Sequence, residues 1–149
     1  MINTLTDFDI NKILKHYKID YNGIFSKNEL PSKLLNGFYV INMESSDKGH
    51  GSHWVALYKI NDGYSQYFDS FGVVPPLDIE NKLHKYDYND RDIQDINSSS
   101  CGFYCVGFIK FMSGKQNVKQ AFKTFIKMFS DNTKQMRKFY IIFCIIKVL

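Results

Sequence analysis

Apolar residues along this chain follow the spacing of helices in some segments and that of strands in others. Near the start they recur every three to four residues, which places them on one face of a helix; they are Ile10, Ile13, Leu14 and Tyr17. Thr6 and Asp9 open that segment with the pattern of a capping box. A nearly continuous apolar run fills residues 101–112, and a second stripe follows in residues 116–130. We therefore predict three helices, the second of them ended by Ser113 and Gly114.

Strand signals occupy the middle of the chain. Residues 54–60 and 64–71 are rich in β-branched and aromatic side chains, and the turn-forming residues 61–63 separate them, which predicts a hairpin. Residues 37–43 predict a further strand beside it, and residues 77–100 a helix or a long loop. The predicted fold class is α+β, with a small, mostly antiparallel sheet packed against a central helix that begins at Cys101.

The register of the hairpin decides which side chains share a face. With a three-residue loop at 61–63, Asp69 lies opposite Val55 and on the same face as His53. With a two-residue loop the register slips by one, and Asp69 points away from His53. We predict the three-residue loop, with Gly63 in the left-handed conformation as a bulge.

Length and composition are those of one globular domain. The chain has 149 residues, 44% of them hydrophobic, and a net charge of +4. Its three cysteines are unevenly spaced, which argues against a disulfide framework and favours a reducing compartment. The N-terminus lacks the pattern of a signal peptide, and no apolar run is long enough to span a bilayer. We expect a single domain over residues 1–149 that is not secreted.

Four residues together indicate a cysteine hydrolase. Cys101 stands at a predicted helix N-terminus, where the helix dipole favours a thiolate. Gln94, seven residues earlier, is a candidate hydrogen-bond donor to an oxyanion. His53 and Asp69, at the open end of the hairpin, are a candidate base and its orienting group. Taken singly, each fits a structural role; their joint presence favours the hydrolase.

The segments that carry these residues resemble the adenovirus-type, or adenain-like, processing proteases. These cysteine proteases belong to the larger group that includes the SUMO and ubiquitin-like-protein proteases. The resemblance rests on the order His53, Asp69, Gln94, Cys101 and on the residues around them, at 53–54, 68–72 and 101–105. It covers roughly residues 5–112 and points to a DNA virus, a virophage or a virus-like transposon.

The resemblance implies a function as well as a site. It implies a cysteine endopeptidase that processes viral capsid or virion precursors at small-residue sites, often glycine, in the virion and in the cytoplasm or nucleus of the host cell. Trp54, with Gly51 and Ser52, would bind substrate, although Trp54 also fits a packing role. We expect a monomer. The alternatives are a protease acting on host ubiquitin-like modifiers and a non-enzymatic, DNA-binding virion protein.

Two departures from the adenovirus enzyme bear on activation. Asp69 stands where that enzyme carries Glu, which keeps the charge and shortens the reach. No cysteine lies between Asp69 and Gln94, so an activating peptide held there by a disulfide is not expected. We expect no obligatory cofactor, and DNA or a non-covalent peptide remains a candidate activator.

Three other features have competing interpretations. His50, His53, Cys101 and Cys105 have spacings poorly suited to zinc, so we predict no metal site. The lysines at every fourth position either form a solvated helix face or contact DNA; they are Lys115, Lys119, Lys123 and Lys127. The apolar residues 139–149 are too few to span a membrane, and they predict a buried strand or helix end, or a tail that contacts a membrane or a partner.

Overall fold

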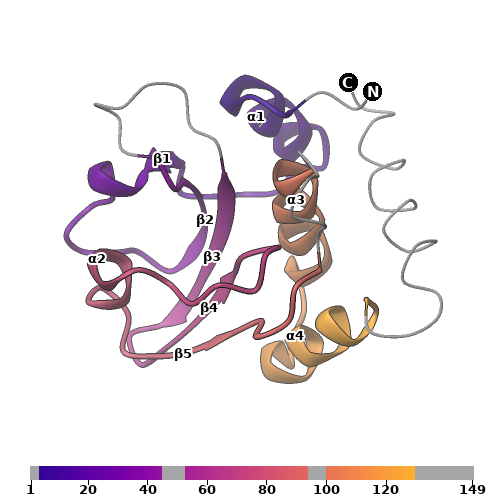
Figure 1. Ribbon diagram of the computed structural model, residues 1–149. Coiled ribbons are helices and arrows are strands. Elements are labelled where there is room, and N and C mark those ends of the chain that lie inside the picture. Colours follow the sequence, from indigo (N-terminus) through magenta and orange to yellow (C-terminus); the bar gives the residue numbers. More distant parts are fainter. Residues whose placement is uncertain (1–3, 45–52, 94–99, 130–149) are drawn as a thin grey trace.

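The computed structural model describes residues 4–44, 53–93 and 100–129. Over these ranges the chain forms a sheet with helices on both of its faces (Figure 1). The elements, in chain order, are α1 (Asp7–His16), β1 (Ile24–Ser26), the short 3-10 helix η1 (Lys27–Glu29), β2 (Gly37–Asn42), β3 (Trp54–Asn61), β4 (Tyr64–Phe68), α2 (Leu77–Glu80), β5 (Lys85–Tyr88), α3 (Cys101–Met112) and α4 (Val118–Lys127).

The α+β class is confirmed, but the sheet is mixed and not mostly antiparallel. Its five strands follow the chain order from β1 to β5. The pairs β2–β3 and β3–β4 are antiparallel, whereas β1–β2 and β4–β5 are parallel. The prediction was wrong because it omitted both edge strands. These have only three and four residues, and neither contains a fully buried side chain.

The hairpin has the predicted register but reaches it by a different turn. Leu57 pairs with Tyr67, and the same register carried to the open end of the hairpin puts Asp69 level with Val55. The turn itself has two residues, because Asn61 pairs with Tyr64, and a bulge between Lys59 and Asn61 restores the register. Gly63 does not adopt a positive φ, so the predicted three-residue loop and left-handed glycine are wrong. An extra residue shifts the pairing of the two strands by one position, whether it lies in the loop or in a bulge within β3.

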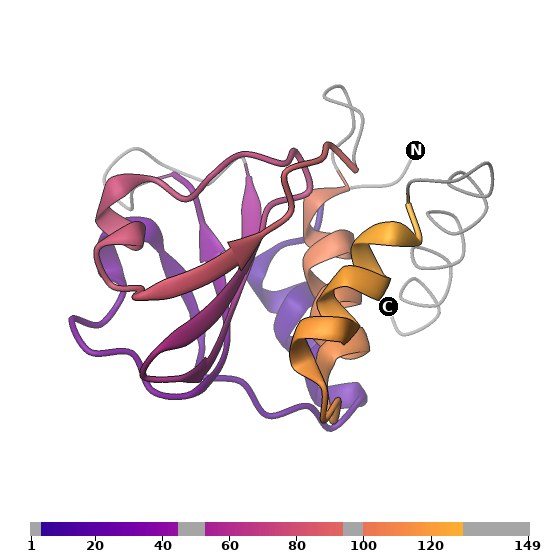
Figure 2. The same cartoon turned by 90° about the horizontal axis from the view of Figure 1, so that it is seen from below.

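Two apolar layers hold the sheet between its helices. The larger lies on the face covered by α1, α3 and α4, and the smaller lies on the opposite face with η1 and α2 (Figure 1). Helix α3 packs against β3 and is flanked by α1 and α4 (Figure 2). Ten of its twelve residues are buried. The capping box predicted for α1 is present, and Asp9 and Thr6 exchange both of its hydrogen bonds. This arrangement fixes the first residue of α3 over the start of β3.

The described parts of the chain contain no candidate membrane-spanning helix. None of the helices there combines the length and the apolar character needed to cross a bilayer.

Candidate active site

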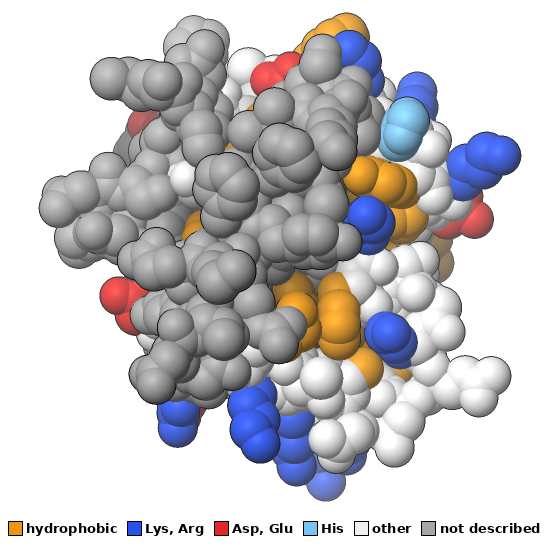
Figure 3. All heavy atoms as spheres, turned by 90° about the vertical axis from the view of Figure 1, so that its right-hand side faces the viewer, with side chains coloured by type: hydrophobic (Ala, Val, Ile, Leu, Met, Phe, Trp, Pro, Cys, Tyr) orange, Lys and Arg blue, Asp and Glu red, His pale blue; other side chains and the backbone are white. Residues whose placement is uncertain are grey.

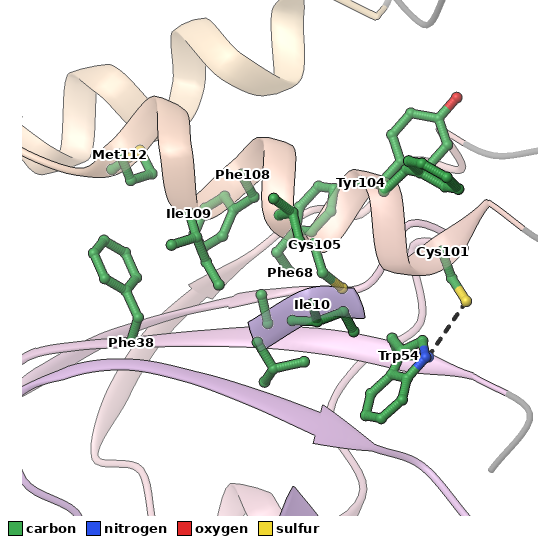
Figure 4. Close-up of a cluster of buried hydrophobic side chains, with 14 of the residues drawn as sticks. Ile10, Phe38, Trp54, Phe68, Cys101, Tyr104, Cys105, Phe108, Ile109 and Met112 are labelled. Atoms are coloured by element: carbon green, nitrogen blue, oxygen red, sulfur yellow. Dashed lines mark hydrogen bonds between the residues drawn. The ribbon is translucent and has the colours of Figure 1, made fainter. Parts of the chain in front are cut away.

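The site lies where α3 begins above the open end of the β3–β4 hairpin. Cys101 is the first residue of α3, and its Sγ accepts a hydrogen bond of 3.4 Å from the backbone N–H of Trp54 (Figure 4). Trp54 is in turn the first residue of β3 and directly follows His53. The thiol is almost completely buried, with 3% exposure. A thiol at this point meets the positive end of the helix dipole, which stabilises negative charge on sulfur.

His53 and Asp69 form a direct contact across the open end of the hairpin. The Nε2 atom of His53 lies 2.7 Å from Oδ1 of Asp69. Asp69 is 4% exposed, so the pair is shielded from solvent screening. The same Oδ1 accepts the backbone N–H of Phe71 at 2.8 Å. The predicted approach of these two side chains is therefore confirmed.

The charge state of His53 follows from its neighbours. Burial alone would lower its pKa, but the hydrogen bond to Asp69, the contact with Cys101 and the charges of both groups outweigh burial and raise the pKa to about 9. The Nδ1 atom is buried and has no hydrogen-bond partner within the described ranges. Hydrogen bonds to a general base are often long or poorly aligned before substrate binds.

Phe71 completes the environment of the imidazole. Its ring stacks on His53 with a centroid separation of 4.5 Å and an interplanar angle of 20°. The stacked ring and the Asp69 carboxylate hold the imidazole from two sides. Sequence reasoning gave Phe71 no role, although its place two residues after Asp69 in a tight turn was a usable signal.

The predicted substrate-binding residues are only partly within view. Trp54 is 7% exposed, and its Nε1 donates to the carbonyl oxygen of Leu5 at 3.0 Å. The same side chain lines a pocket of about 440 Å³ between the start of α1 and β1, which also contains Asn42 and Glu29. Trp54 therefore both packs in the core and borders an open cleft. Gly51, Ser52 and Gln94 lie outside the described residues.

The second cysteine of α3 has a different environment. Cys105 is fully buried one turn along the helix, near Ile10 and Phe68 (Figure 4). Burial, with smaller contributions from the charges of Cys101 and Asp69, raises the pKa of this thiol well above its usual value. The prediction that Cys105 belongs to the core is confirmed.

The residues weighed as zinc ligands do not form a cluster in the described ranges. There, no three side chains of His, Cys, Asp or Glu lie close enough together to hold a metal ion. His50 is outside those ranges.

The four lysines do not share one helix. Lys115 precedes α4, and the other three are exposed on α4. Lys123 and Lys127 border a groove that also contains Asp87 and Asp90. On this side of the molecule several Lys and Arg side chains gather at the lower edge of the view, and others stand singly between apolar and uncharged surface (Figure 3). DNA binding by these lysines stays a prediction.

Among known proteins, the chain is similar in sequence to a viral thiol protease. No protein-family model matches the chain. The "Putative thiol protease R355" of Acanthamoeba polyphaga mimivirus is 37% identical over an alignment of 81 positions, which covers 44% of this chain and 26% of that protein. The chain resembles a viral thiol protease. It spans only about a quarter of the length of that relative.

Solved structures give a weaker likeness. Two crystal structures of a protease from ASFV match with TM-scores of 0.41 and 0.43 at 19% and 16% identity, over 83% of this chain and 67% and 66% of theirs. The central domain of the uncharacterized Lpg1148 protein from Legionella pneumophila matches with a TM-score of 0.46 at 14% identity, over 97% of this chain and 99% of its own. These likenesses are too low to indicate a function.

Proposed function

We propose that this chain is a cysteine endopeptidase that matures viral capsid or virion precursor proteins. The observation that carries the proposal is the contact of His53 with Asp69 directly beside the buried thiol of Cys101. A thiol, an imidazole and a carboxylate in this order are the parts of a nucleophilic triad. The similarity to the mimivirus thiol protease supports the same activity.

The chemistry follows from the roles of the three side chains. The Cys101 thiolate attacks the scissile carbonyl carbon and forms a tetrahedral oxyanion. Protonated His53 gives its proton to the leaving amine, which leaves a thioester on Cys101. Neutral His53 then takes a proton from water, and the resulting hydroxide attacks the thioester carbon. The C–S bond breaks, the acyl product leaves as a carboxylic acid, and the Cys101 thiolate and protonated His53 are restored. Asp69 keeps the imidazole in one tautomer and stabilises its charged form throughout.

Two donors are suited to the oxyanion. The backbone N–H of Cys101 belongs to the first residue of α3, where N–H groups have no partner within the helix. We assign the second donor to the side-chain amide of Gln94. Loss of one such donor lowers kcat by about 10²–10³.

The cleft beside Trp54 is the proposed binding site for the residues before the scissile bond. The indole of Trp54 borders this cleft and is almost completely buried, and we propose that it narrows the passage toward Cys101. A narrow passage excludes large side chains, and we propose cleavage after small residues, glycine in particular. The proposed setting is the virion and the infected cell, and DNA is a proposed activator through the lysines at 115, 119, 123 and 127.

Co-expression with the capsid proteins of the same genome tests the function. The wild type should shorten at least one of them at a single site, whereas Cys101→Ala should leave it intact. Cys105→Ala is the matched control and should cleave like the wild type. Peptides with glycine before the bond, assayed beside ubiquitin-like fusion proteins, identify the substrate class. Cleavage of the fusions alone would favour the modifier protease, and cleavage of nothing would end the proposal.

A further inference from the structure

The turn that carries Asp69 is joined to a second segment of the chain. The backbone N–H of Ile93 donates to the carbonyl oxygen of Ser70 at 2.9 Å. Gly72 has a φ of +72°, and a Cβ there would lie 2.7 Å from the carbonyl carbon of Arg91. Any side chain at residue 72 would therefore push the two segments apart. The turn after β4 and the segment after β5 form one tightly packed junction.

Asn89 is the side chain at the centre of this junction. It follows β5 and is 1% exposed. The backbone N–H of Asp69 donates to its Oδ1 at 3.0 Å, and its Nδ2 donates to the carbonyl oxygen of Asp69. The same Nδ2 also reaches the carbonyl oxygen of Arg91 at 3.3 Å. One amide thus binds both polar groups of the Asp69 main chain and connects them to the neighbouring segment.

The direction of the Asp69 carboxylate depends on that main chain. Its Oδ1 accepts both the Phe71 N–H and Nε2 of His53, at 2.8 and 2.7 Å. The carbonyl oxygen of Asp69 also accepts the N–H of Gly72 at 2.8 Å, which closes the turn. A rotation of the Asp69 backbone would move Oδ1 away from the imidazole. Since a misplacement of about 1 Å can cost roughly 10² in rate, the contacts that fix this backbone affect catalysis.

We propose that Asn89 is a positioning residue for the Asp69 carboxylate. Its side-chain amide holds the backbone of Asp69 so that the carboxylate meets Nε2 of His53. The inference rests on the proposed protease function for its effect on rate, but the effect on the His53–Asp69 contact is independent of any substrate.

The test measures the His53–Asp69 contact and the cleavage rate separately. In Asn89→Ala, NMR titration of the His53 ring should give a pKa that falls from about 9 toward 6.5, because the hydrogen bond to Asp69 is weakened. The value of kcat/KM should fall about 10²-fold. Asn22→Ala is the matched control, since Asn22 also donates to backbone carbonyls, those of Leu35 and Asn36, beside a positive-φ glycine far from the site. It should change neither quantity.

The outcomes separate the two proposals. An unchanged His53 pKa in a folded Asn89→Ala protein would overturn the positioning role, even if the protein were less stable. If this variant does not fold, Asn89→Ser keeps a hydroxyl at the junction and is judged by the same pKa criterion. If Asn89→Ala lowers the pKa of His53 but the wild-type chain cleaves no substrate, the positioning role is supported and the proposed protease function is refuted.

Discussion

Two cysteines one turn apart on α3 have opposite surroundings. Cys101 and Cys105 are both buried and both lie over the sheet (Figure 4). Cys101 accepts the Trp54 N–H and faces the His53–Asp69 pair, whereas Cys105 lies fully buried in the apolar core, where burial raises its pKa. Burial alone therefore does not decide whether a thiol is reactive. We expect the polar groups within reach of the sulfur to decide it.

Replacing each of the two cysteines in turn should give the largest difference in cleavage rate. Cys101→Ala should lower the cleavage rate about a millionfold, to background, with its fold retained by circular dichroism. Cys105→Ala should keep the rate within about threefold and lose about 1 kcal/mol of unfolding free energy, since it opens a small cavity. Equal activity of wild type and Cys101→Ala would remove Cys101 as the nucleophile.

Loss of the Asp69 carboxylate should have the next largest effect on the cleavage rate. Asp69→Asn leaves the shape of the site but should lower kcat by about 10⁴, because the amide no longer stabilises imidazolium. Kinetics on a cleaved capsid peptide measure this loss. Glu44→Gln, a carboxylate change on the loop after β2, is the control and should leave kcat unchanged. A loss below tenfold in Asp69→Asn would show that His53 needs no orienting acid.

The amide of Gln94 should have a smaller effect on the rate. Gln94→Ala should reduce kcat by about 10²–10³ with little change in KM, as expected for a contact made only with the oxyanion. Gln94→Glu keeps the size and removes the donor, so the same loss in both variants would assign the effect to hydrogen bonding. A change confined to KM would argue for substrate binding instead.

Folding stability should report the same pair without substrate. The pKa of His53 is raised from 6.5 to about 9 in the folded chain. The stabilisation from protonated His53 is therefore complete below about pH 6.5 and is lost as the pH rises through about 9. Urea unfolding across this window should show falling stability for the wild type and a much smaller decline for Asp69→Asn. Parallel curves would mean that the contact does not stabilise the fold.

The strongly patterned parts of this fold could be predicted from the sequence, and the weakly patterned parts could not. The start of α3 at Cys101 follows from a long apolar run. The hairpin register was predicted from a three-residue loop, and the structure has the same register with a two-residue turn and a bulge. The predicted length of the turn was wrong, because a bulge between Lys59 and Asn61 supplies the extra residue that was assigned to the loop. Strands β1 and β5 were missed because they are short and half-exposed.

The same contrast holds within the candidate site. The approach of His53 and Asp69 could be predicted from the hairpin register, and the place of Cys101 beside them was implied by the resemblance to a protease family. Asn89 lies in a polar stretch with no pattern, and its contacts with Asp69 arise from two segments twenty residues apart. No local spacing rule connects such residues. Tertiary packing alone brings them together.

Selective alkylation of the two α3 thiols tests the central claim most directly. The third cysteine of the chain, Cys144, is replaced by serine. Limiting iodoacetamide at pH 7 should then modify Cys101 at least about tenfold faster than Cys105, because the thiolate is the reactive form and burial raises the pKa of Cys105. Mass spectrometry with fragmentation locates the adduct. His53→Ala should slow the reaction of Cys101 and leave Cys105 unchanged. Equal rates at both thiols, or no effect of His53→Ala, would contradict the account.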